Sequence, residues 1–91
     1  MIKTYASKAL KAFATEGDSS NLPVRNYERA SRVLATLDAA TMPEDMQLPG
    51  FRFQCLDTIP KRYAVDASGN YQITWGWDNG HAVDVGIEKY H

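Results

Sequence analysis

The sequence predicts an α+β domain in which two helices pack against an antiparallel β-meander of about four strands. Helical patterns fill residues 7–40, whereas alternating apolar and polar residues fill much of 51–87. An Asn79-Gly80 turn stands between two alternating segments, which is a strong signal for a β-hairpin. Helices followed by strands favour a sheet covered on one face. With 91 residues, we expect a single domain over 1–91.

The N-terminal half carries the helical signals. Residues 1–5 form a short apolar-edged segment that we expect to be a strand. A first helix is expected over residues 7–14, because Ser7 suits the N-cap position. A second helix is expected over residues 23–40, because Pro23 suits a first helical turn and apolar residues recur after it at helical spacing.

Short strands make up the C-terminal half. Prolines and a glycine exclude regular structure over residues 41–50. The expected strands are 51–56, 62–67, 71–77 and 81–87. The third strand carries four apolar residues at period two, which predicts one buried face: Tyr71, Ile73, Trp75 and Trp77. Ser68-Gly69-Asn70 predicts a tight turn before it.

Composition limits the classes of function. The net charge is -1, whereas a small domain that grips nucleic acid through its phosphates is usually basic. Cys55 is the single cysteine, which excludes an internal disulfide and a cysteine zinc cluster, and we expect it to be buried. No stretch approaches the roughly 20 apolar residues that span a bilayer, and no signal peptide is evident. We therefore expect a cytoplasmic protein without membrane association.

The last two residues are suited to acid–base chemistry. The final strand leads into Tyr90-His91. An imidazole with a pKa of about 6.5 can act as acid or base near neutral pH, whereas a phenol with a pKa of about 10 is a poor base unless its pKa is shifted. A strand-end aromatic and an exposed chain end would explain the same residues. Neither a metal-ligand spacing nor a glycine-rich phosphate loop is present, so we expect no metal and no cofactor.

Six segments occur in a characteristic order: Met1–Lys3, Leu34–Thr41, Pro43–Gly50 with Arg52, Ser68–Trp75, Asp78–Gly80 and Tyr90-His91. This ordered set resembles the HigB toxins, the plasmid maintenance system killer branch of the RelE/ParE superfamily, over nearly the whole chain. The resemblance implies a RelE-like fold and the toxin of a type II toxin–antitoxin system. It also implies a HigA-like helix-turn-helix antitoxin, and metal-independent cleavage of mRNA on the ribosome.

Such cleavage transfers a phosphoryl group to the 2′-hydroxyl of the RNA itself. It needs a group that takes the hydroxyl proton, a group that protonates the leaving 5′-oxygen, and cations that stabilise the charge on phosphorus. The resemblance assigns the proton transfers to Tyr90 and His91, the predicted catalytic residues. The expected RNA contacts are Asn70, Gln72, Lys61, Arg62 and Arg52.

The chain departs from the family at several positions that are commonly basic. Gln72 and Asp57 stand where arginine and lysine are usual, and Asp66 stands close to a further basic position. A carboxylate near the scissile phosphate would repel it by roughly 1 kcal/mol in water. One alternative is therefore a catalytically degenerate relative that binds an antitoxin or regulates an operon. Another is an enzyme with a shifted target, built on Lys61 and Arg62.

Overall fold

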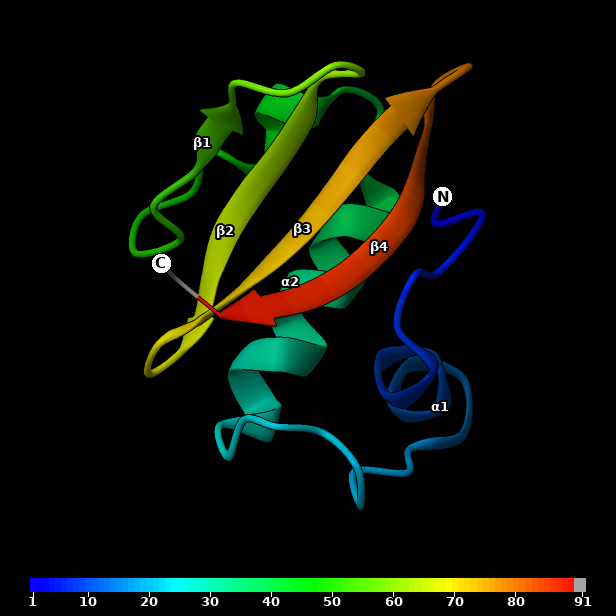
Figure 1. Ribbon diagram of the computed structural model, residues 1–91, viewed down its shortest axis with the longest axis vertical. Helices are drawn as coiled ribbons and strands as arrows, with labels where there is room; N and C mark the ends of the chain where they lie inside the picture. Colours follow the sequence, from blue (N-terminus) through cyan, green and yellow to red (C-terminus); the bar gives the residue numbers. More distant parts are fainter. Residues whose placement is uncertain (90–91) are drawn as a thin grey trace.

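The computed structural model describes residues 1–89 and contains two helices and one four-stranded sheet (Figure 1). The elements are α1 (Lys8–Glu16), α2 (Tyr27–Ala39), the 3-10 helix η1 (Pro43–Met46), β1 (Gln54–Leu56), β2 (Arg62–Ser68), β3 (Tyr71–Asp78) and β4 (His81–Lys89). All three strand pairs are antiparallel, in the order β1-β2-β3-β4. The α+β prediction, with two helices on a four-stranded meander, is confirmed.

Each helix begins at a side chain that caps its free amides. Ser7 Oγ accepts a hydrogen bond from the Leu10 N–H at 3.2 Å, as the sequence predicts for the first helix. The second helix begins after Asn26, whose side-chain oxygen accepts from the Arg29 N–H at 3.1 Å. The predicted start at Pro23 is wrong. Pro23 lies in the preceding loop, because the residue that satisfies a free amide of the first turn stands three positions later.

The hydrophobic core fills the space between the helices and one face of the sheet. In Figure 1, α2 lies behind the sheet, and its buried residues include Val33 and Leu37. Ile73 and Trp75 of β3 are fully buried in the same core. The two outer residues of the predicted apolar face, Tyr71 and Trp77, are half-buried and pack against the core. The period-two prediction for this strand is confirmed.

The edges of the sheet differ from the prediction. Residues 1–5 form two isolated parallel bridges to β4, at Ile2 and Tyr5, rather than a continuous strand. The first strand of the meander covers only Gln54–Leu56, because Arg52 has a left-handed φ of 53° that interrupts extended backbone. The segment 41–50, expected to be irregular, contains the short helix η1. Cys55, expected to be buried, is exposed on the edge strand.

Both tight turns occur where the sequence predicts them. Asn79 and Gly80 have φ values of 49° and 80°, and the flanking residues Asp78 and His81 are strand partners. Two positive φ angles match the hairpin turn that Asn-Gly favours. In the turn between β2 and β3, the left-handed residue is Gly69, with φ 58°.

Candidate functional site

A row of polar side chains crosses the sheet face that the helices leave open. Gln72 of β3 is the strand partner of Asp66 on β2 and of Glu88 on β4. Directly opposed residues of antiparallel strands project from the same face, with Cβ atoms about 5 Å apart. Since Ile73 projects into the core, its neighbour Gln72 projects to the opposite face. The three side chains therefore form one line, which we call the acceptor row.

Two oxygen atoms of this row are buried without a hydrogen-bond donor. The side chain of Gln72 belongs to a residue only 9% exposed. Its Oε1, like Asp66 Oδ1, has no hydrogen-bond partner within residues 1–89. An unsatisfied buried acceptor costs about 1–3 kcal/mol, and native proteins retain few of them. This feature could not be predicted from the sequence, because burial of a strand's polar face depends on its neighbours in the sheet.

A polar hollow of about 400 Å³ adjoins the Asp66 end of the row, between the N-terminus of α2 and the turn between β2 and β3. Arg52 Nη1 lies 3.6 Å from Asp66 Oδ2, and the Arg52 side chain is 80% exposed. Arg29 Nε donates to the Asp66 carbonyl oxygen at 3.1 Å, and its guanidinium also donates to the Gly50 carbonyl. Arg29 thus holds the loop before β1 against β2.

Three of the predicted RNA-contacting residues gather at this end of the sheet. Arg52 pairs with the acceptor row, Gln72 is part of it, and Asn70 lies in the exposed turn that precedes β3. Strand β4 ends here too, because Lys89 is the partner of Tyr71. The predicted catalytic residues, Tyr90 and His91, directly follow Lys89 in the sequence and lie outside the described residues.

The other two predicted RNA contacts lie at the opposite end of β2. Arg62 opens this seven-residue strand, so about 20 Å of extended chain separates it from the turn at the other end. Its Nη2 donates to Thr74 Oγ1 at 3.2 Å and to the Asp84 carbonyl at 2.9 Å. Lys61 Nζ lies 5.8 Å from the centre of the Tyr63 ring. The structure therefore does not bring Lys61 together with Arg52, Asn70 and Gln72. The Arg62 guanidinium reaches Thr74, two residues from Gln72 on the same face of β3.

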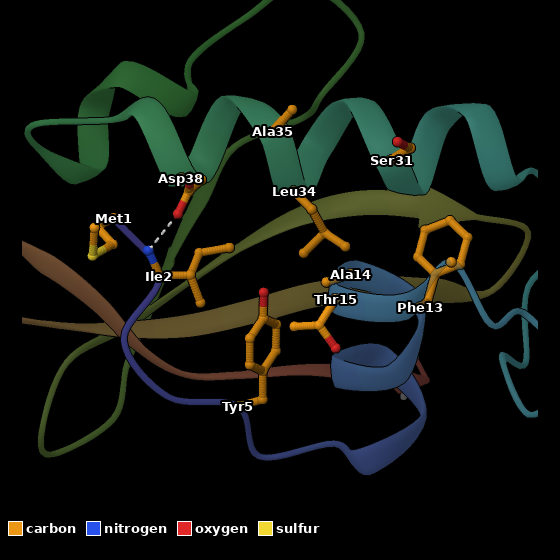
Figure 2. Close-up of a pocket in the computed structure, with 11 residues that line it drawn as sticks. Met1, Ile2, Tyr5, Phe13, Ala14, Thr15, Ser31, Leu34, Ala35 and Asp38 are labelled. Atoms are coloured by element: carbon orange, nitrogen blue, oxygen red, sulfur yellow. Dashed lines mark hydrogen bonds between the residues drawn. The ribbon is translucent and has the colours of Figure 1, made fainter.

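A second hollow lies on the helical side of the molecule. It has a volume of about 640 Å³ and lies between the N-terminal segment, α1 and α2. Figure 2 shows Tyr5, Phe13 and Leu34 lining it, with a hydrogen bond from the Ile2 N–H to Asp38 Oδ1 at 2.8 Å. Burial, and secondly the negative charge of Asp38, raise the pKa of the Tyr5 phenol. This groove lies on the opposite side of the sheet from the acceptor row.

Within residues 1–89, His, Cys, Asp and Glu side chains form no group of three or more that could hold a metal ion. Neither helix in that range combines the length and apolar character that crossing a bilayer requires.

Comparisons with known proteins agree with the resemblance read from the motifs. A family model described as RelE-like toxin of type II toxin-antitoxin system HigB matches residues 3–91. The chain is also similar to the Endoribonuclease HigB of Proteus vulgaris, with 27% identity over 92 residues and coverage of 100% of both chains.

Proposed function

Because this chain belongs to the HigB-like toxin family, we propose that it is a toxin that cleaves mRNA on the ribosome and is neutralised by a HigA-like helix-turn-helix antitoxin. The observation that carries this proposal is the end-to-end similarity to an endoribonuclease of the same family. The open sheet face supports it, because polar groups gather where β4 ends, and the two residues that the resemblance makes catalytic follow β4 in the sequence.

In the proposed reaction, RNA lies across the end of the sheet that carries Arg52, Asn70 and Gln72. The 2′-oxygen attacks the adjacent phosphorus and loses its proton, while the bond to the 5′-oxygen breaks and that oxygen gains a proton. The products are a 2′,3′-cyclic phosphate and a 5′-hydroxyl. Tyr90 and His91 are the proposed proton-transfer groups, since an imidazole exchanges protons readily near neutral pH.

Charge stabilisation in this proposal depends chiefly on Arg52. Its guanidinium forms an ion pair with one oxygen of Asp66, and most of the side chain is exposed to solvent. Arg62 would have to give up hydrogen bonds to Thr74 and Asp84 before it contacted RNA. Lys61, an exposed residue at the far end of β2, is proposed to contact more distant phosphates of the RNA.

A second candidate is a non-catalytic relative that acts by binding its antitoxin. The specific observation in its favour is the pair of carboxylates, Asp66 and Glu88, on either side of Gln72. Each would repel a phosphate by roughly 1 kcal/mol in water and by more where water is excluded. The shifted-target enzyme built on Lys61 and Arg62 has less support, because the Arg62 side chain is already used within the sheet.

Controlled expression in a bacterium separates the two candidates. The chain is compared with a Tyr90→Ala variant that also lacks His91, and with Lys11→Ala, a control at an exposed position of α1. We expect growth arrest and new mRNA 5′-ends with the parent chain and the control, but not with the first variant. Cleavage by purified protein should require added ribosomes. Normal growth and intact transcripts, with abundant folded parent protein, would refute mRNA cleavage and favour the non-catalytic relative that binds its antitoxin.

A further inference from the structure

Two acceptor oxygens of the acceptor row have no hydrogen-bond donor within residues 1–89. Asp66 Oδ1 and Gln72 Oε1 belong to directly opposed residues on neighbouring strands, and both atoms are buried without a partner in residues 1–89. Gln72 is only 9% exposed, so a ligand that contacts its oxygen has to displace the side chains that cover it. Native proteins retain few such acceptors, and a bound ligand is one way to supply the missing hydrogen atoms.

The surroundings of the row favour a donor-bearing ligand over a phosphate. Arg52 approaches only the second oxygen of Asp66, at 3.6 Å from Oδ2, which leaves Oδ1 available. Glu88 adds a carboxylate on the other side of Gln72. Arg52 partly neutralises Asp66 through Oδ2, whereas the free Oδ1 and the Glu88 carboxylate attract N–H groups. The matching ligand therefore presents at least two neighbouring N–H donors.

Among the RNA bases, guanine alone presents two adjacent donor groups, N1–H and N2–H₂, on its Watson–Crick edge. Adenine and cytosine each place one amino group beside an acceptor nitrogen, and uracil has one N–H between two carbonyls. Proteins read single-stranded RNA through hydrogen bonds to this edge. We propose that the acceptor row selects guanine, with Asp66 Oδ1 accepting from N1–H and Gln72 Oε1 accepting from N2–H.

This inference rests on the proposed function, because it assigns base recognition to the same face that would hold mRNA. The guanine would lie beside the Asn70 turn and the end of β4, where Lys89 pairs with Tyr71. It also gives a reason for glutamine at position 72, where related toxins commonly have arginine. An arginine there would bind phosphate, whereas an uncharged acceptor next to Asp66 binds a base edge.

Fluorescence anisotropy with short labelled RNAs tests the inference without relying on cleavage. The probes are five-nucleotide 2′-O-methyl oligouridines, which resist cleavage, with a central guanosine, inosine, 7-deazaguanosine or adenosine. Guanosine and 7-deazaguanosine share the same Watson–Crick edge and should bind equally. Inosine lacks the N2 amino group and should bind about tenfold more weakly.

Two variants connect that preference to the row. In Asp66→Asn, the amide oxygen should face Arg52, so the amide NH₂ would oppose the N1–H that guanosine and inosine share. Both probes should then bind more weakly, and the advantage of guanosine over adenosine should disappear. Asp57→Asn removes an exposed carboxylate far from the row and is the matched charge control. Gln72→Leu keeps similar bulk without the acceptor, and it should bind guanosine and inosine RNA equally. Thermal unfolding of each variant confirms that it is folded.

Equal binding of guanosine and inosine RNA by the parent chain, or undetectable binding of all four probes, would overturn the inference even if mRNA cleavage in cells were intact. A guanosine preference in a chain that cleaves no mRNA would support it and refute the nuclease function separately. Loss of antitoxin binding in Asp66→Asn and Gln72→Leu, without a guanosine preference in the parent chain, would overturn it and assign the row to a donor group of the partner protein.

Discussion

Replacing Arg62 by methionine is expected to destabilise the fold, and not only to weaken contacts with RNA. One nitrogen of its guanidinium donates both to Thr74 Oγ1 at 3.2 Å and to the Asp84 carbonyl at 2.9 Å. The side chain thereby joins β2 to β3 and to β4 at the irregularity where Asp84 has a φ of 50°. Methionine retains much of the aliphatic packing of arginine but none of the donors.

The magnitude follows from these two hydrogen bonds. A hydrogen bond from a charged donor contributes about 1.5–3 kcal/mol, and the partial exposure of Arg62 puts each of these at the lower end or below it. Thr74 is 0% exposed, so its hydroxyl loses a partner that water replaces poorly. We expect the free energy of unfolding to fall by about 2 kcal/mol. In a domain of this size, that corresponds to a fall in Tm of about 8–16 °C.

Urea unfolding followed by tryptophan fluorescence measures this change. Thr74→Val removes the hydroxyl that Arg62 contacts, and the double variant Arg62→Met/Thr74→Val measures the coupling between the two side chains. A coupling of about 0.5 kcal/mol or more is expected for residues in direct contact. If Arg62→Met changes stability by less than about 0.5 kcal/mol but weakens RNA binding, the reasoning is refuted and Arg62 returns to the RNA-contacting role that the sequence suggested.

Three further changes test local features of the fold. Gly80→Ala should lower the free energy of unfolding by about 1 kcal/mol, because its φ of 80° suits glycine; an unchanged urea midpoint would contradict this. Ser7→Ala should cost about 1 kcal/mol through loss of the α1 cap, whereas Ser7→Asp should retain most of the stability; equal thermal stability of the two variants would count against the cap. Because burial and Asp38 raise the pKa of the Tyr5 phenol, folding favours its protonated form. That stability is fully present below the unfolded pKa of about 10 and is lost as pH rises through the higher folded pKa. Tm measured against pH should therefore fall less steeply above pH 10 in Tyr5→Phe, and parallel curves for the two proteins would show that Tyr5 is not responsible.

The sequence was most informative where a structure depends on neighbouring residues. Ser7 caps a helix through an amide three residues away, and Asn79-Gly80 fits a turn through its own backbone angles. The alternation around Ile73 and Trp75 identified the buried face of β3 in the same way. The start of α2 was predicted wrongly, because Pro23 suits a first helical turn but lies in the preceding loop. The structure uses Asn26.

The candidate site depended on more than local pattern. For two of its proposed residues, Tyr90 and His91, the side chains suggest acid–base chemistry and the resemblance to HigB toxins assigns the catalytic role. Lys61 and Arg62 stand close in sequence to the other candidates, yet consecutive strands of a meander run in opposite directions and carry both backbones to the far end of the sheet. Only the Arg62 side chain reaches back, as far as Thr74.

By itself, the sequence determined the fold class, most of the helices and strands, and the family. These follow from hydrophobic periodicity, helix caps, turns and the order of motifs, all of which are properties of the sequence itself. Only the tertiary structure decided which polar side chains share an end of the sheet and which of their atoms lack a partner. Asp66, Gln72 and Glu88 form one row because the registers of two strand pairs align them, and Gln72 is buried because of what surrounds it. Register and burial are properties of the assembled sheet, so no single segment of the sequence contains them.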